Sequence, residues 1–197
     1  MQKKRLAKFS ELRKKLIVGI LSAERTTWAL QAMTIAGLKF PEVERKYLNF
    51  VDEAWSALWD HFYVGAGTVL DRAPQAASLL SVSKLARTLV EDNAESIAVL
   101  DELDARISQQ SEQLWKQLLE WRNRAIAHND ASVDKLELYA RNRMHVSDCE
   151  KIISSFFDEL NEISYVALGD VLYGRGPGLQ IMIDETVAIY ERLNRPS

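Results

Sequence analysis

Three side chains that together could handle an RNA phosphate stand close to one another in this sequence. Arg122 is followed directly by Asn123, and His128 comes six positions after the arginine. An arginine carries a permanent positive charge on a planar group with five N–H donors, which suits a phosphate. A histidine gives and takes protons near neutral pH, so it can act as a general acid or base. This combination could cut RNA without a metal, because the 2′-hydroxyl of the RNA can serve as the nucleophile.

The pattern of Arg122-Asn123, four further residues and His128 resembles the signature of HEPN-domain proteins, and in particular their abortive-infection branch. The helical periodicity around the motif fits that superfamily. The resemblance implies an all-α, HEPN-like domain that forms a two-fold dimer and brings two copies of the motif into one cleft. It also implies a metal-independent endoribonuclease, often the toxin of a toxin–antitoxin or anti-phage module with an antitoxin protein as its partner.

Arg122 and His128 do not face each other on a continuous helix. Their separation corresponds to about 240° of rotation and ~9 Å of rise. Either the helix ends between them, or a second copy of the motif completes the site, as the resemblance implies. Arg124 lies one turn before His128 and is a rival for the role of phosphate clamp.

On the ribonuclease hypothesis, one His128 removes the proton from the 2′-hydroxyl of the RNA. The His128 of a second copy, or a water, protonates the leaving 5′-oxygen. Arg122 stabilises the charge on the phosphate in the transition state, and Asn123 orients the phosphate or the histidine. Asp130 could hold the imidazole in one tautomer, or it could be an ordinary turn residue. We expect the products to carry 2′,3′-cyclic phosphates, and we expect the protein to need no metal or cofactor.

A purely structural interpretation of the motif stays open. Histidine and arginine side chains at the C-terminal end of a helix can simply interact with its last carbonyl groups. The chain could then be a non-catalytic helical dimer that binds RNA, a nucleotide or a protein partner. The net charge of −3 slightly favours this alternative, because a protein that binds RNA broadly gains affinity by neutralising phosphates.

The length and composition fit one globular domain over residues 1–197, with 47% hydrophobic and 27% charged residues. The charge is unevenly distributed. Residues 1–15 hold seven basic side chains and Glu11 as the one acid, whereas residues 91–104 hold six acids and no base. The basic segment could meet RNA, an anionic lipid surface or an acidic partner, but a solvated helix face is the favoured explanation.

Cys149 is the only cysteine, so the chain cannot form an internal disulfide. We expect it to be a small buried side chain, because an active thiolate would need a nearby base and the geometry toward His145 is doubtful. Cys149, His145 and His61 are not spaced in the sequence as the ligands of a zinc site are. The apolar run at 16–23 is shorter than the ~18 residues that span a bilayer, which predicts a cytoplasmic protein without a membrane segment.

Apolar residues recur at helical spacing along most of the chain, and no alternating strand pattern extends beyond a few residues. The sequence therefore predicts a bundle of about five to seven helices. Trp55 and Trp59, one turn apart, should fill a seam between helices. The alternative with a direct function is that they form an exposed aromatic platform on which bases stack. The predicted helices begin at Ser10, at Pro41, at a cap on Ser83, at Ala94 (running to His128, with a kink or break near 108–111), at a capping box on Ser147 (running to about Leu172) and at Leu179.

Overall fold

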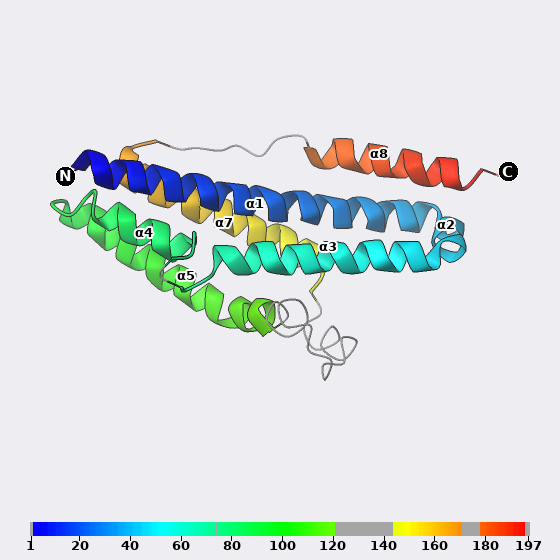
Figure 1. Ribbon diagram of the computed structural model, residues 1–197, viewed down its shortest axis with the longest axis horizontal. Helices are drawn as coiled ribbons and strands as arrows, with labels where there is room; N and C mark the ends of the chain where they lie inside the picture. Colours follow the sequence, from blue (N-terminus) through cyan, green and yellow to red (C-terminus); the bar gives the residue numbers. More distant parts are fainter. Residues whose placement is uncertain (1, 74, 121–143, 171–177, 196–197) are drawn as a thin grey trace.

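The computed structural model describes residues 2–73, 75–120, 144–170 and 178–195. Within these ranges it is entirely helical, with seven helices and no strand, so the predicted all-α class is confirmed there. The longest helix, α1, runs along the molecule, and α3, α4, α7 and α8 pack against it (Figure 1). The helices are α1 (Gln2–Lys39), α2 (Pro41–Lys46), α3 (Leu48–Val69), α4 (Leu79–Arg87), α5 (Ala94–Glu120), α7 (Val146–Leu168) and α8 (Gly178–Leu193).

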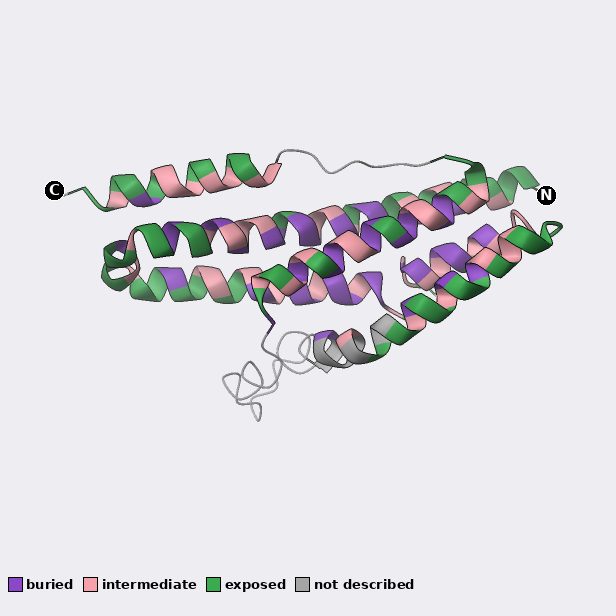
Figure 2. Ribbon diagram, turned by 180° about the vertical axis from the view of Figure 1, so that it is seen from behind, coloured by how far each residue is buried: buried purple, intermediate pink, exposed green. Residues whose placement is uncertain are grey.

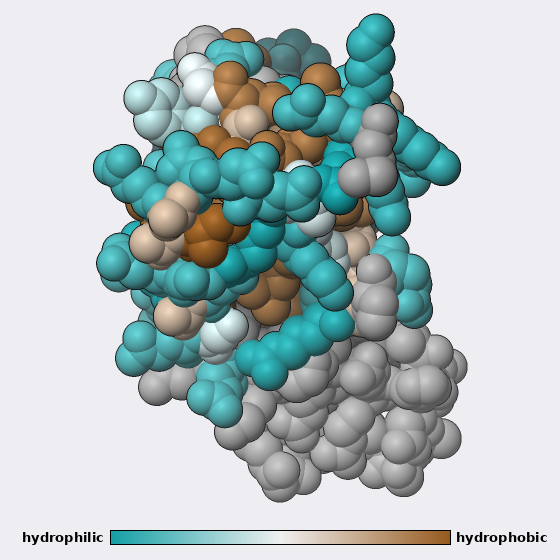
Figure 3. Space-filling view, turned by 90° about the vertical axis from the view of Figure 1, so that its left-hand side faces the viewer, coloured by the Kyte–Doolittle hydropathy of each residue, from teal (hydrophilic) through white to brown (hydrophobic). Residues whose placement is uncertain are grey.

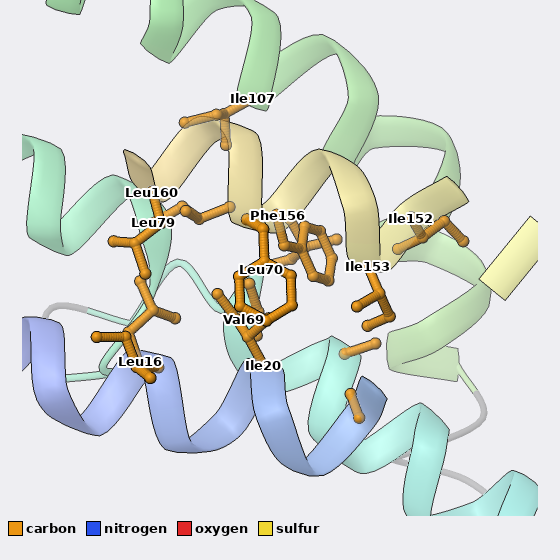
Figure 4. Packing of buried hydrophobic residues seen from close by; sticks show 14 of the residues in the cluster. Leu16, Ile20, Val69, Leu70, Leu79, Ile107, Ile152, Ile153, Phe156 and Leu160 are labelled. Carbon is orange, nitrogen blue, oxygen red and sulfur yellow. The ribbon is translucent and has the colours of Figure 1, made fainter. Parts of the chain in front are cut away.

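The main hydrophobic core lies where α1, α3, α4, α5 and α7 meet. Each of these helices turns its buried residues toward the others and leaves an exposed face to solvent (Figure 2). This is the pattern expected of amphipathic helices in a bundle. Figure 4 shows part of this packing, with side chains from α1, α4, α5, α7 and the end of α3: Leu16, Ile20, Val69, Leu70, Leu79, Ile107, Ile152, Ile153, Phe156 and Leu160.

The first helix begins at Gln2, so the predicted start at Ser10 is wrong by two turns. Contacts with distant residues hold these added turns in place. Phe9 is completely buried in the core. Arg5 donates to the carbonyl of Thr88 at 2.9 Å and to the Glu91 carboxylate at 2.6 Å. The local cap signal at Ser10 is therefore overridden by packing and by pairing with the acidic stretch.

The predicted helix start at Pro41 is confirmed, but the chain bends again at Tyr47 and divides this region into α2 and α3. The second piece then continues to Val69. Gly65 lets α3 approach α1 closely, because a Cβ built there would lie 3.3 Å from the Cβ of Ala23. Without a side chain at Gly65, the two helix backbones can lie nearly in contact.

Two predicted caps are wrong. Ser78, not Ser83, caps α4, and its Oγ accepts from the backbone N–H of Ser81 at 3.4 Å. Ser83 lies inside the helix on its buried face. The cap residue of α7 is His145, and Ser147 lies in the first turn with no side-chain cap hydrogen bond at this helix start. The helix begins earlier than the serine signal because Val146 already packs against the core.

The other end of α7 comes slightly earlier than expected. It stops at Leu168, where Gly169 adopts the left-handed conformation with φ of 68°. This backbone geometry ends a helix at little cost only in glycine or a few polar residues. By contrast, α5 runs without a break through residues 108–111, so the interruption considered there is absent. The predicted continuation of this helix to His128 lies outside the described residues.

The tryptophan prediction is confirmed for Trp59, which is buried in the core against the rings of Phe62 and Tyr63. Trp55, one turn earlier, is half-buried and packs on the same core. These two indole rings therefore fill a seam between helices. They do not form an open platform for stacking bases.

The last helix, α8, lies along the C-terminal half of α1 (Figure 1). Its Tyr190 contributes to a second, smaller hydrophobic cluster with Ala36 and Val43. At its other end, Gly178 touches the ring of Trp28 so closely that a Cβ would lie 2.2 Å from it. None of the described helices is long and apolar enough to cross a membrane.

We expect Phe62→Ala to lower the free energy of unfolding by about 3–5 kcal/mol, because it deletes a fully buried aromatic ring at the centre of the core. Urea unfolding followed by circular dichroism measures the change. Phe50→Ala is the matched control, since Phe50 lies on the same helix and is 72% exposed. Equal losses for the two variants would contradict the orientation of α3.

Candidate functional site

The predicted catalytic motif falls between α5 and α7. Arg122, Asn123, Arg124, His128 and Asp130 all lie outside the described residues, which stop at Glu120 and resume at Met144. The structure thus defines what flanks the motif. The end of α5 and the start of α7 lie on the same side of the bundle (Figures 1 and 2).

Both flanks of the motif are anchored in the hydrophobic core. Leu118, four residues before Arg122, is completely buried, and Leu114 packs against the same cluster. On the far side, Met144 is buried and Val146 packs beside it. The described residues on both sides of the motif are therefore fixed in the core, which is the kind of support that a positioned catalytic group needs.

A second group of polar side chains lies between α5 and α7, farther from the motif. Arg106 of α5 forms an ion pair with Glu162 of α7. One turn earlier on α7, Glu159 is only 2% exposed. Its Oε1 accepts from the hydroxyl of Ser155 at 3.2 Å, and no hydrogen-bond partner for Oε2 is found among the described residues. A shallow hollow of about 550 Å³ opens over these four residues.

Burial raises the pKa of Glu159 to about 7, against the opposing effects of the Ser155 hydrogen bond and the Arg106 charge. Glu162 and Asp158 add smaller effects in the same direction as burial. A carboxyl group with such a pKa can donate or accept a proton at neutral pH. It stands 13 residues along α7 from Val146, however, which is about 20 Å of helix. Glu159 therefore marks a place separate from the flanks of the motif.

The sequence interpretation missed Glu159, although a signal for it was present. Glu159 lies seven residues after Ile152 and four before Ile163, within the apolar stripe of α7. A lone acid in such a stripe must be buried when the helix packs. Burial of a carboxyl group in turn favours its neutral form.

The other candidate side chains have structural roles. Cys149 is completely buried, as predicted, and burial raises the pKa of its thiol to about 12, which keeps it protonated and unreactive. His61 lies on the surface seam between α1 and α3, where its Nε2 is 2.9 Å from the hydroxyl of Ser22. His145 acts through its backbone carbonyl, which accepts from Asp148 and Cys149 at the start of α7. Among the described residues, no three metal-binding side chains gather closely enough to hold an ion.

The basic N-terminal segment is mostly a solvated helix face, as favoured from the sequence. Its five lysines are exposed, and Lys15 pairs with Glu11 within the helix. Arg5 forms an ion pair with Glu91 of the acidic stretch. Among the described residues this is the one ion pair between the two charged segments. The end of the molecule where α1 begins is mainly hydrophilic, with a smaller hydrophobic area (Figure 3).

Comparison with protein-family models decides the classification. The model of the HEPN AbiU2 family matches residues 3–175. The chain belongs to this family. Membership confirms the resemblance to HEPN proteins and to their abortive-infection branch. The matched range includes the segment with Arg122 and His128 and stops before α8, so the family pattern corresponds to helices α1 to α7. No curated protein and no solved structure matches the chain.

We expect Glu159→Gln to make the protein more stable than the wild type at pH 8 and about equally stable at pH 5. An acid whose pKa is raised in the folded state stabilises the fold only while protonated. The contribution is complete below about pH 4.5 and is lost as the pH rises through about 7. At pH 8 the free energy of unfolding of Glu159→Gln should exceed that of the wild type by on the order of 2–3 kcal/mol.

Thermal unfolding at the two pH values tests this expectation. Glu102→Gln, an exposed acid on α5, is the control and should shift both values little. A stability difference for Glu159→Gln that does not change with pH would contradict the raised pKa.

Proposed function

We propose that this protein is a metal-independent endoribonuclease of HEPN type, the toxin of a toxin–antitoxin or anti-phage module. The observation that carries the proposal is the Arg122-Asn123 to His128 motif, found in a chain that belongs to the AbiU2 family. Support also comes from its position, since both flanks of the motif are anchored in a helical core. RNA is the proposed substrate, and an antitoxin protein is the proposed partner.

In this mechanism His128 of one subunit takes the proton from the 2′-hydroxyl, which attacks the adjacent phosphate. The bond from phosphorus to the 5′-oxygen breaks, and His128 of the second subunit, or a water, protonates that oxygen. Arg122 stabilises the additional negative charge on the phosphate in the transition state. Asn123 orients the phosphate or the histidine, and Asp130 holds the imidazole tautomer. The products carry 2′,3′-cyclic phosphate and 5′-hydroxyl ends.

The net charge of −3 favours a second candidate function, a non-catalytic helical dimer that binds RNA, a nucleotide or a protein partner. A protein that held RNA mainly through many phosphate contacts would gain from a positive net charge. On this alternative the motif binds a ligand without cutting it. The two functions differ in one readout, the appearance of new RNA ends.

We expect purified wild-type protein to cleave RNA in the presence of EDTA, and His128→Ala to leave it intact. Arg122→Ala should lower the rate by about 10²–10³-fold, the usual loss when a donor to a charged transition state is removed. Arg124→Ala removes the same charge two residues away and tests the rival clamp, because a larger loss in this variant than in Arg122→Ala would assign the phosphate contact to Arg124. Gel analysis with mapping of cyclic phosphate ends measures the reaction. Equal cleavage by wild type and His128→Ala would overturn the proposal, and intact RNA with both would favour the binding function.

We also expect the protein to be a dimer at micromolar concentration, because Arg122 and His128 cannot face each other on a continuous helix and the HEPN resemblance implies a site completed by a second copy. Light scattering after size-exclusion chromatography gives the mass directly. A protein that cleaves RNA as a strict monomer would exclude the composite site and leave a single His128 with a water as its acid.

A further inference from the structure

A cavity of about 520 Å³ lies between the N-terminal half of α1, the connection from α3 to α4, and α4 itself. Each of these three elements places a basic side chain on its wall. They are Lys8 from α1, Arg72 from the connection and Lys84 from α4. Asp71 is the one acidic residue on the wall, and its Oδ1 accepts from the backbone N–H of Ala73 at 2.8 Å. The balance of charge in the cavity is therefore positive.

The arginines near the cavity form ion pairs, whereas the two lysines on its wall do not. Arg5 is paired with Glu91, and Arg87 bonds to Asp101 and Asp104 on α5. Lys8 and Lys84 are exposed, and neither forms an ion pair with any residue in the part of the chain that the structure describes. Two positive charges thus converge on one hollow while the neighbouring arginines hold the helices together.

The first turn of α4 adds further groups that suit an anion. Leu80 and Ser81 of this turn line the cavity, and the N-terminal end of a helix carries a partial positive charge. Ser78 caps the helix and donates its hydroxyl hydrogen to Ser81 Oγ at 3.1 Å. The hydroxyl hydrogen of Ser81 can then point to a ligand. Lysine, a helix N-terminus and serine hydroxyls are common binding groups for phosphate.

The rest of the wall is apolar and gives the cavity room for more than a bare ion. Leu12, Leu80 and Leu85 contribute this part of the lining. A volume of about 520 Å³ is within the range of sites that hold small organic molecules. A phosphate attached to a ribose and a base would fit this mixture of a charged rim and an apolar wall better than inorganic phosphate.

We propose that this cavity binds a phosphate group carried by a nucleotide, either as a unit of an RNA strand or as a free nucleotide. Binding of phosphate here does not depend on cleavage, but the assignment of the strand as the enzyme's substrate rests on the proposed function. The cavity lies away from the described end of α5, which leads into the motif. Arg87 of α4 meets α5 at Asp104, and from there to Glu120 α5 rises about 24 Å toward the motif. A strand that reached both places would span several nucleotides.

The test is the affinity of Lys8→Gln/Lys84→Gln for two fluorescent probes, a 2′-O-methyl RNA 12-mer and labelled ADP. Fluorescence anisotropy is measured over a range of salt concentrations. The 12-mer lacks the 2′-hydroxyl nucleophile, so its binding is independent of any ribonuclease activity. We expect about tenfold weaker binding and a shallower salt dependence, because each lost contact to a single strand reduces the slope by about 0.7.

Lys4→Gln/Lys14→Gln is the matched control. Both lysines are exposed on α1, lie outside the cavity and carry the same charge. The control should bind within about twofold of wild type, whereas a nonspecific basic face would make the two pairs equivalent. A loss confined to the 12-mer assigns the cavity to a strand, and a loss confined to ADP assigns it to a free nucleotide. Equal effects of the two pairs on both probes, or no binding of either probe by wild type, would overturn the proposal.

Discussion

The burial of α1 along nearly its whole length is the constraint on which the other helices depend. Its buried positions extend from Phe9 to Gly37, and they face α3, α4, α7 and α8 in turn. Two buried hydroxyls on this face, those of Thr26 and Thr27, donate to carbonyls one turn earlier in the same helix. A long helix that is buried on several sides can act as a common support. The places of the cavity beside α4 and of the cluster around Tyr190 both follow from it.

The pair α5 and α7 has the more direct relation to function, because the motif segment joins them. Leu118, which precedes this segment, and Met144, which follows it, are both buried in the core. The same pair buries Glu159 beside the Arg106–Glu162 ion pair, which costs stability whenever the carboxyl group is ionised. The stability of the interface between α5 and α7 therefore depends on pH in the physiological range. The flanks of the motif and this titrating group belong to one packed unit.

The basic side chains fall into two groups, arginines that pair with acids and lysines that stay exposed. Arg5 of the basic segment and Arg87 of α4 pair with three acids of the stretch from Glu91 to Asp104. The lysines of α1 remain in solvent. This arrangement reconciles a negative net charge with a local site for an anion, because affinity depends on the charges within a Debye length of the ligand. The family match ends before α8, whose Tyr190 packs with Ala36 of α1 and Val43 of α2.

The sequence by itself determined the all-α class, the helix start at Pro41 and the motif that led to the family, because helical periodicity, backbone restrictions and residue chemistry are local properties. The starts of α1 and α7 were decided by tertiary packing, since the core contacts of Phe9 and Val146 outweigh a serine cap worth only about 1 kcal/mol. The raised pKa of Glu159 and the convergence of Lys8 and Lys84 likewise needed the fold. Desolvation and the summed field of distant charges exist only once separate helices have come together.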